Sequence, residues 1–430
     1  MIKRATDRPT VAVIGGGAAG MTAAIRAAEC GAAVVLIERN DRLGRKLRIT
    51  GKGRCNLTNN CERDEFLAHV PTNPRFLYAA LAQNGPADTM RWFEERGVPL
   101  KTERGRRVFP VSDRADDIAE ALAKQCRERG VRIVHARASG ITAEGNTATG
   151  VSLAAGEQIP ADAVILCTGG LSYPGTGSDG DGYRFAAALG HTVTPTRPSL
   201  VPLVAEGDLC ARLQGLSLRN VGLRVADRKT GRIVYEDFGE LLFTHFGLSG
   251  PTILSASAHL SDIAPGKYEV RIDLKPALDR QKLDARLLSD LAKFANRDLA
   301  NAFDELLPRK LIGPMIDLCG LDPRKKANSV TREERERLLE RLKCFRVPLL
   351  GMRPISEAVI TRGGVDVKEV EPGSMRSRKV ANLFFAGEIL DVDAYTGGFN
   401  LQIAFSTAAL AGENAAQTAA TIFRGTEEQP

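Results

Sequence analysis

The chain has 430 residues, of which 43% are hydrophobic, so it can fill the cores of two or three domains and is not a disordered polypeptide. No apolar run reaches the roughly 18 to 20 residues that a membrane span needs, which excludes an integral helical membrane protein. The formal net charge of +7 leaves open a nucleic-acid partner.

The N-terminus offers one stretch that resembles a signal peptide, because basic residues at 1–4 precede an apolar segment from 11 to 25. That segment lacks a cleavage site and runs directly into Arg26, so we expect a cytoplasmic protein.

The cysteines are scattered and form no C-x-x-C pair, which indicates neither a zinc site nor a dithiol redox motif. They are Cys30, Cys55, Cys61, Cys126, Cys167, Cys210, Cys319 and Cys344. A flavoenzyme that passes electrons through such a pair is therefore not indicated.

The first predicted elements form a dinucleotide-binding unit. The apolar strand 11–14 runs into Gly15-x-Gly17-x-x-Gly20, and an Ala-rich helix follows from 21 to 28. The first glycine permits a tight turn, the second lets backbone approach a pyrophosphate, and the third allows close packing of helix on strand. The helix start offers free N–H groups and a positive dipole to the anion.

The second predicted strand, 34–37, ends in an acid, Glu38. A carboxylate at this distance from the glycines accepts hydrogen bonds from both hydroxyls of an adenosine ribose. Because it would repel a 2′-phosphate, the pattern predicts FAD or NAD as the bound dinucleotide rather than NADP.

A basic run follows directly: Arg39, Arg42, Arg45, Lys46, Arg48, Lys52 and Arg54. Glycines at 44, 51 and 53 interrupt it, which suits a loop around an anionic cofactor better than a solvated helix face or a polynucleotide site. We expect a small-molecule substrate rather than a nucleic acid.

Further along, residues 98–111 predict a hairpin that turns at Gly105. Ser112 or Asp113 is expected to cap the next helix, which ends at Gly130, and a strand should begin at 131.

The loop Leu43-Gly-Arg-Lys-Leu47, followed by Thr50-Gly-Lys-Gly-Arg-Cys-Asn56, resembles the signature of a bacterial flavoprotein family. Its members are aminoacetone-oxidase-type and bile-acid-reductase-type NAD(P)/FAD-dependent oxidoreductases, distantly similar to the flavoprotein subunits of succinate dehydrogenase and fumarate reductase. The resemblance implies that this loop passes the pyrophosphate and reaches the flavin ring. For Cys55, positive neighbours could lower the thiol pKa, but backbone contact is the preferred interpretation.

Two further stretches extend the resemblance. The apolar strand 163–167 ends in Thr168-Gly169-Gly170, and the strand 382–386 ends in Gly387-Glu388. Residues 397–402 open an Ala-rich helix that is expected to run to about 411. Glu388 suits the ribityl hydroxyls, and N–H groups of residues 400–403 could stabilise negative charge on the N1–C2=O edge of reduced flavin.

The candidate FAD contacts are Gly15, Gly17, Ala19, Gly20, Glu38, Arg39, Lys46, Gly51, Arg54, Cys55, Asn56, Ala138, Thr168, Gly169, Gly387, Glu388, Gly398, Asn400, Leu401 and Gln402. Ala138 is included only by analogy, through backbone contact with the adenine.

Residues 175–180 also spell G-x-G-x-x-G, but a turn rather than a strand precedes them. We interpret them as a loop that caps the helix from 183 to 189, close to the flavin by resemblance, and not as a second nucleotide site.

The spacing of apolar residues changes in the middle of the chain. Alternating apolar residues from about 196 predict a β-rich insertion, and helical spacing between 279 and 343 predicts a small helical subdomain with a capping box at Thr331 and Glu334. The expected fold is α/β: a discontinuous Rossmann-like FAD domain (1–195 and 350–430), a β-rich domain (196–278 and 344–349) and the helical subdomain (279–343). We expect the insertion to cover the flavin ring and to set substrate specificity.

These features predict an FAD-dependent oxidoreductase in which hydride passes between a small organic substrate and flavin N5. No catalytic acid or base is identified, since even His245, the most suggestive histidine, has no acidic partner nearby in sequence. NAD(P)H is a possible transient donor. The alternatives are an FAD-dependent tRNA-modifying enzyme, for which residues 323–326 are a modest basic candidate, and a flavin-loaded redox sensor.

Overall fold

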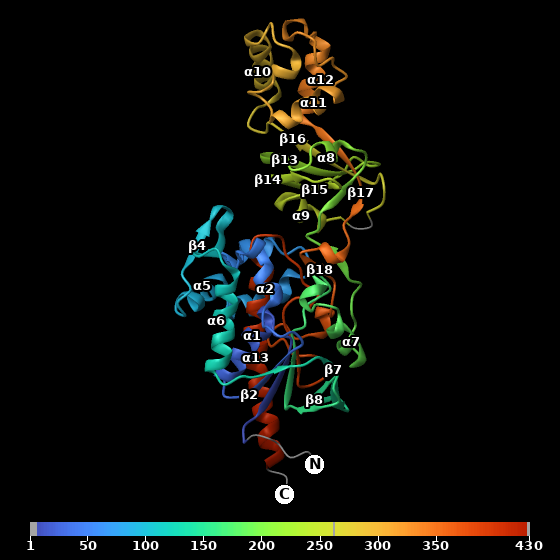
Figure 1. Ribbon diagram of the computed structural model, residues 1–430. Coiled ribbons are helices and arrows are strands. Elements are labelled where there is room, and N and C mark those ends of the chain that lie inside the picture. The colour runs from blue at the N-terminus through green and yellow to red at the C-terminus, as the bar shows by residue number, and fades with distance from the viewer. Residues whose placement is uncertain (1–6, 261–262, 428–430) are drawn as a thin grey trace. The chain divides into compact units, whose positions relative to one another are not determined.

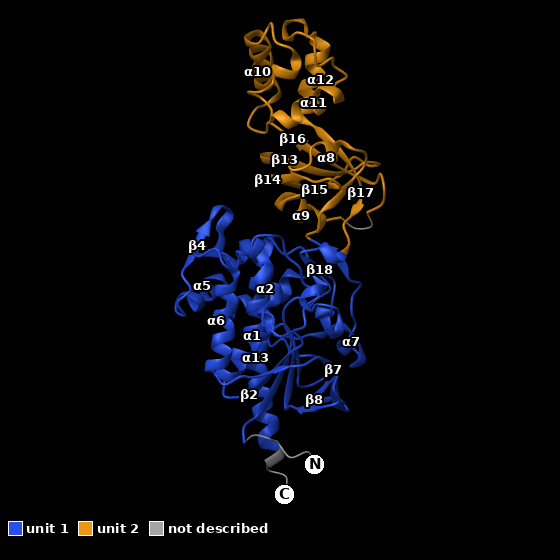
Figure 2. Cartoon of the chain, in the orientation of Figure 1, with its two compact units in different colours: residues 1–199, 355–430 blue, residues 200–354 orange. Residues whose placement is uncertain are grey.

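The computed structural model describes residues 7–260 and 263–427. It divides into two compact units: unit 1 comprises residues up to 199 together with those from 355 onward, and unit 2 comprises residues 200–354 (Figure 2). Each unit has its own hydrophobic core.

Unit 1 is built on a parallel five-stranded sheet. Its strands in spatial order are β19 (Leu383–Phe385), β10 (Ala163–Leu166), β1 (Thr10–Ile14), β2 (Ala33–Glu38) and β6 (Arg132–His135). Val11 pairs with Ala163 on one side and with Val34 on the other, so β1 is central. Short runs of β-branched residues suit a parallel sheet whose two faces are both covered. The predicted α/β, Rossmann-like fold class is confirmed.

The helices of unit 1 lie around this sheet (Figure 1). They are α1 (Ala18–Glu29), α2 (Arg45–Ile49), α3 (Arg63–Ala68), α4 (Tyr78–Gln83), α5 (Pro86–Glu94), α6 (Ala115–Glu128), α7 (Asp181–Ala188) and α13 (Phe399–Glu427). At Gly412, a Cβ atom would lie 2.4 Å from the Ala23 carbonyl oxygen, so this glycine lets α13 pack closely against α1. The last helix therefore continues well past the predicted end near 411.

Three small sheets complete unit 1. They are β3 (Thr58–Asn59) with β5 (Arg107–Pro110) and β4 (Leu100–Glu103); β7 (Ala138–Glu144) with β8 (Thr147–Leu153) and β9 (Gln158–Pro160); and β11 (Arg197–Ser199) with β18 (Ile360–Arg362). The pairing of β4 with β5 confirms the predicted hairpin. The predicted cap of the following helix is wrong, because Arg114 occupies the N-cap position and no side chain caps α6. The Ser112 hydroxyl instead accepts the Arg114 N–H, in a turn before the helix.

Unit 2 contains a closed six-stranded barrel. Its strands in spatial order are β12 (Leu203–Ala205), β15 (Gly247–Ser249), β14 (Ile233–Phe243), β13 (Ser217–Asp227), β16 (Tyr268–Asp273) and β17 (Phe345–Met352). Its helices are α8 (Leu209–Arg212), α9 (Pro251–Ser257), α10 (Arg280–Lys293), α11 (Arg309–Leu318) and α12 (Arg332–Lys343). At the start of α12, the Thr331 hydroxyl accepts the Glu334 N–H and the Glu334 carboxylate accepts the Thr331 N–H, which confirms the predicted capping box.

Within the described part of the chain, none of the helices combines the length and the apolar character that crossing a bilayer would demand.

Candidate dinucleotide site

The glycine-rich turn lies between β1 and α1, at the carboxyl edge of the parallel sheet. Gly15 has φ +102°, and a Cβ atom there would lie 2.6 Å from the Cys167 carbonyl oxygen. A Cβ atom at Gly20 would lie 1.6 Å from the Gly15 carbonyl oxygen. At Gly17, the N-cap of α1, a Cβ atom would meet no protein atom within 4 Å. Two of the glycines are thus required by the protein's own packing, whereas the third faces open space.

Glu38 is buried at the end of β2 and binds the turn directly. One of its carboxylate oxygens accepts the Gly16 N–H at 2.7 Å, and the other accepts the backbone and side-chain N–H groups of Asn40 at 2.8 and 2.6 Å. A carboxylate offers about four acceptor positions. Roughly one of these is left for a ribose hydroxyl, and engaging both hydroxyls would require the Asn40 amide to turn away.

A second carboxylate, Glu388, follows β19 and is held by side chains and backbone from three other segments. Lys46 Nζ lies 2.6 Å from one of its oxygens and also donates to the Ser172 hydroxyl at 2.6 Å. The other oxygen accepts from Ser172 Oγ at 2.8 Å and from the Thr361 N–H at 2.9 Å. The structure thus brings together Lys46 and Glu388, which are 342 positions apart in the chain.

Ser172 and Thr361 were missed by the sequence analysis. Neither belongs to a recognisable motif with a catalytic or binding signature. Residues 358–365 also resemble the flavoprotein family, and that resemblance could have drawn attention to Thr361 but not to Ser172.

The family-specific loop reaches the first turn of α13. Asn59 Nδ2 donates to the Gly397 carbonyl at 3.1 Å, and the Asn56 amide lies 3.0 Å from the Gly398 N–H. Gly398 has φ +99°, and a Cβ atom there would lie 2.3 Å from the Thr58 carbonyl oxygen. The loop that follows α2 and the start of the last helix therefore form one continuous surface.

The side chains of two predicted contacts in this helix are engaged within the protein. Asn400 bonds to the backbone of Ala394, and the fully buried Gln402 bonds to Thr58 and Thr89. The Gln402 N–H donates to the Gly398 carbonyl at 3.1 Å, within the helix. Any flavin contact from this turn would thus come from backbone N–H groups nearer its start, around 400 and 401.

Arg54 and Arg39 both turn toward protein carboxylates. Arg54 pairs with Glu103 and Asp113, and its guanidinium lies 4.2 Å from the centre of the Phe109 ring. Arg39 pairs with Asp179 in the loop after β10.

Cys55 is fully buried, and burial raises its pKa to about 12. The alternative of an activated, low-pKa thiol at Cys55 is therefore wrong. Gly51, in the same loop, has φ +57°, and a Cβ atom there would lie 2.9 Å from the Asn56 backbone nitrogen.

The loop 175–180 packs on the residues that follow β2. Asn40 Nδ2 donates to the Thr176 carbonyl at 3.0 Å, and the loop opens with the 3-10 turn Pro174–Thr176, before which no strand directly ends. Ala138, the first residue of β7, is buried, and Ala136 donates to the Glu38 carbonyl at 3.0 Å.

The residues at this edge fit a bound dinucleotide. The Thr168 hydroxyl, just after β10 and beside Gly169, is buried and has no hydrogen-bond partner among the described residues. It lies against Gly182 of α7, where a Cβ atom would come within 1.9 Å of it, so it reflects close packing of α7 on this edge. The open side of Gly17 and the uncapped start of α1 lie at the same edge, one strand away.

The fold and this edge define a dinucleotide-binding protein of the Rossmann type. The chain belongs to the family described as HI0933-like protein Rossmann domain, whose model matches residues 9–414. The predicted resemblance to this flavoprotein family is confirmed.

Two characterised relatives are similar over nearly their whole length. The 3-dehydro-bile acid delta(4,6)-reductase of Clostridium scindens is 33% identical over 95% of this chain and 99% of its own. The ribosomal RNA dihydrouridine synthase of Escherichia coli is 33% identical over 94% of this chain and 96% of its own. Among solved structures, a 3-ketosteroid delta1-dehydrogenase from Sterolibacterium denitrificans superposes with a TM-score of 0.50 at 14% identity, covering 95% of this chain and 99% of that one. That likeness bears on the fold alone.

These findings make the protein an FAD-dependent oxidoreductase. The individual FAD contacts stay predictions.

Proposed function

We propose that this enzyme reduces a carbon–carbon double bond conjugated with a carbonyl group. The observation that carries the proposal is the convergence of four adjacent parallel strands, whose carboxyl ends bring the glycine turn, Glu38, Thr168 and Glu388 to one edge. The names of the two relatives supply the reaction type. Both describe saturation of a double bond that a carbonyl activates, in a 3-dehydro bile acid and in uracil.

The protein's own groups would bind and orient the cofactor. The N-terminus of α1 would face the pyrophosphate, Glu38 one ribose hydroxyl, and the Lys46–Glu388 pair the ribityl chain. Backbone N–H groups near Asn400 would face the flavin's N1–C2=O edge, where negative charge develops on reduction. When bound, FAD supplies hydride transfer at N5.

The overall reaction adds one hydride to the β-carbon and one proton to the α-carbon of the conjugated bond. The hydride must come from an external reductant, and we propose a nicotinamide nucleotide that binds transiently. The proposed cytoplasmic setting suits this donor and fits the eight free cysteines.

Anaerobic spectroscopy of the full-length protein tests the proposal. We expect yellow protein that NADH or NADPH bleaches, and that a 4-ene-3-ketosteroid recolours without oxygen while its saturated analogue does not. Recolouring by air alone would indicate an oxidase. Colourless protein that takes up no FAD would overturn the proposal entirely.

A second candidate substrate is uridine within ribosomal RNA, which the second relative's name and one surface feature favour. The β4–β5 hairpin presents Arg104, Arg106 and Arg107 around its tip, and of these Arg106 pairs with Glu65. The carbonyl oxygen of Gly105 accepts from Asn59, the residue that also contacts Gly397. A basic tip beside the site suits phosphate groups.

The basic stretch in the insertion, residues 323–326, has fewer unpaired cations to offer to phosphate groups. Lys325 pairs with Glu334 and Lys326 with Asp298, which neutralises two of its three cations. In the anaerobic assay, this candidate predicts recolouring by a ribosomal RNA fragment, steep weakening with salt, and loss of that response in Arg104→Glu. Arg127→Glu, an exposed change on α6, serves as the control. An RNA fragment that leaves the bleached protein unchanged excludes this candidate.

A further inference from the structure

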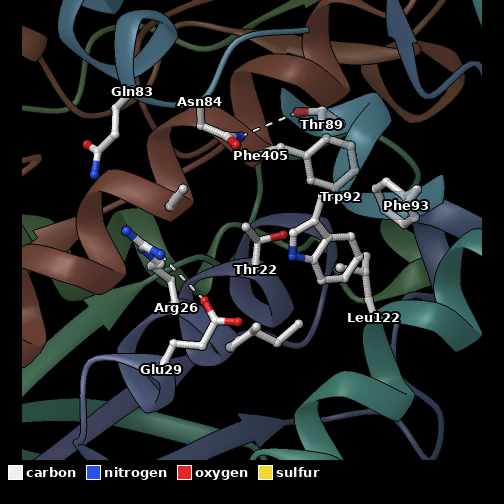
Figure 3. A pocket seen from close by; sticks show the side chains of 12 residues that line it. Thr22, Arg26, Glu29, Gln83, Asn84, Thr89, Trp92, Phe93, Leu122 and Phe405 are labelled. Atoms are coloured by element: carbon white, nitrogen blue, oxygen red, sulfur yellow. Dashed lines mark hydrogen bonds and ion pairs between the residues drawn. The ribbon is translucent and has the colours of Figure 1, made fainter. Parts of the chain in front are cut away.

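A cavity of about 150 Å³ lies in unit 1 among α1, α4, α5, α6 and α13 (Figure 3). It is separate from the glycine turn, and none of the predicted FAD contacts lines it. Its lining side chains are Thr22, Ile25, Arg26, Glu29, Gln83, Asn84, Thr89, Trp92, Phe93, Leu122, Phe405 and Ala409.

The walls of the cavity are apolar and aromatic. Ile25, Phe93, Leu122 and Phe405 are buried, and Trp92 is half-buried with its ring 4.7 Å from that of Phe93. A cavity of roughly this volume with such walls accommodates one benzene-sized ring. The volume and the apolar lining of the cavity therefore suit a molecule with a single ring.

The rim of the cavity is polar and carries charge. Arg26 and Gln83 both donate to Glu413, at 2.7 and 2.6 Å. Figure 3 shows Arg26 beside Glu29, whose carboxylate lies 3.6 Å from the guanidinium. Arg26, Glu29 and Glu413 stay half-exposed and Gln83 is exposed, so these groups can exchange a hydrogen bond with one hydroxyl group of a ligand.

A buried hydrogen-bond network links the cavity wall to the predicted flavin edge. Gln402 Nε2 donates to the Thr89 hydroxyl at 2.9 Å and to the Asn84 carbonyl at 3.1 Å. Gln402 Oε1 accepts from the Thr58 hydroxyl at 2.7 Å. Gln402 and Thr58 are completely buried, and Thr58 lies against Gly398 at the start of α13. A buried network has few alternative pairings. Displacement of Asn84 or Thr89 is therefore expected to shift Gln402 and Thr58, and with them the start of α13.

We propose that this cavity binds a small neutral molecule with one aromatic ring and one hydroxyl group, and that Gln402 couples its occupancy to the flavin environment. Binding itself does not depend on FAD. The coupling rests on the proposed position of the flavin at the first turn of α13.

Trp92 gives a direct readout of binding, because it is the protein's only tryptophan. We would titrate p-cresol into the full-length protein and follow Trp92 fluorescence, calorimetric heat and the flavin absorption spectrum together. We expect saturable binding by the first two signals and a flavin difference spectrum with the same midpoint.

Cavity-filling variants test the location. Ala409→Phe and Thr22→Leu should each weaken cresol binding by about tenfold or more, which corresponds to about 1.4 kcal/mol. Ala420→Phe, at a half-buried position of the same helix outside the cavity, should change it by less than about twofold. Two filling variants are used so that the misfolding of one leaves the other informative.

Gln402→Met tests the coupling. It should retain cresol binding and lose the flavin difference spectrum. Absence of saturable binding, or equal affinity in the filling variants and the wild type, overturns the site. Binding that leaves the flavin spectrum of the wild type unchanged overturns the coupling while the site stands, and a failure of the proposed function would show separately as protein without flavin.

Discussion

At the scale of single residues, the three glycines of the turn differ in what restricts them. Gly20 is required by the fold, since its Cβ position is occupied by the Gly15 carbonyl oxygen. Gly17 has an ordinary extended backbone, with φ −80°, and no protein atom near its Cβ position. Only a ligand would restrict the side chain at this position.

This difference gives a matched pair of variants. Gly17→Ala should leave the thermal stability of the FAD-free protein within about 0.5 kcal/mol of wild type and weaken FAD binding by about tenfold or more. Gly20→Ala should lower stability whether or not FAD is present. Calorimetry of both forms with FAD titration measures both effects. If Gly17→Ala binds FAD as tightly as the wild type, the pyrophosphate does not lie at this turn.

The identities of these glycines and of Glu38 could be predicted from sequence, because spacing after a strand determines where they lie. The directions in which the side chains of Asn400, Gln402 and Arg54 point could not be predicted from sequence. Each is decided by partners distant in sequence, such as Thr89 for Gln402 and Glu103 for Arg54. No local pattern in the chain encodes those partners.

At the scale of elements, local patterns predicted the parallel strands, the β4–β5 hairpin and the capping box of α12. Local patterns failed where contacts between segments distant in sequence determine the structure. The last helix runs past Gly412, a residue that often ends helices, because this glycine contacts α1. Barrel closure depends on Leu203 pairing with both Leu248 and Met352, which alternation along one strand cannot reveal.

The Glu369 carboxylate joins three segments of unit 1 that are distant from one another in sequence. Glu369 lies in the turn Val367–Glu369, accepts the Thr192 N–H at 2.8 Å and lies 2.6 Å from Lys379 Nζ. Partial burial opposes its ionisation, but these hydrogen bonds outweigh that effect and lower the pKa of the Glu369 carboxyl to about 2. Since the folded-state pKa is depressed, the stabilisation is present above the usual value of 4.5 and is lost as pH falls toward 2.

Glu369→Gln should therefore destabilise the protein by about 1 to 3 kcal/mol at pH 7, and the deficit should shrink steadily between about pH 4.5 and pH 2. Chemical denaturation across this range measures it, with the exposed Glu157→Gln as control. A deficit independent of pH would show that the ionised carboxylate is not what stabilises this region.

At the scale of the whole molecule, the two ends of unit 2 leave unit 1 at neighbouring points. Strand β11 pairs antiparallel with β18, and Ser199 lies opposite Ile360. Residues 279–343 share a hydrophobic core with the barrel. Sequence could indicate that an insertion exists, because motifs at both ends of the chain resemble one cofactor site. Helical spacing marked residues 279–343 as a separate subdomain, and that division stays a prediction.

We predict that unit 1 folds without unit 2. A variant in which a short Gly/Ser linker replaces residues 200–354 should bind FAD with the stoichiometry of the full-length protein, unfold cooperatively, and show no reductase activity. Flavin absorbance and calorimetry check the first two properties. A linked variant that aggregates or stays colourless would mean that the cofactor site needs residues from unit 2.

The β11–β18 pair has an evolutionary consequence. Unit 2 is an insertion that leaves and rejoins unit 1 beside one two-stranded sheet. Its length or sequence can therefore change without altering the pairing register of the parallel sheet in unit 1. The five parallel strands, which carry the glycine turn, Glu38 and Glu388, all lie outside that insertion.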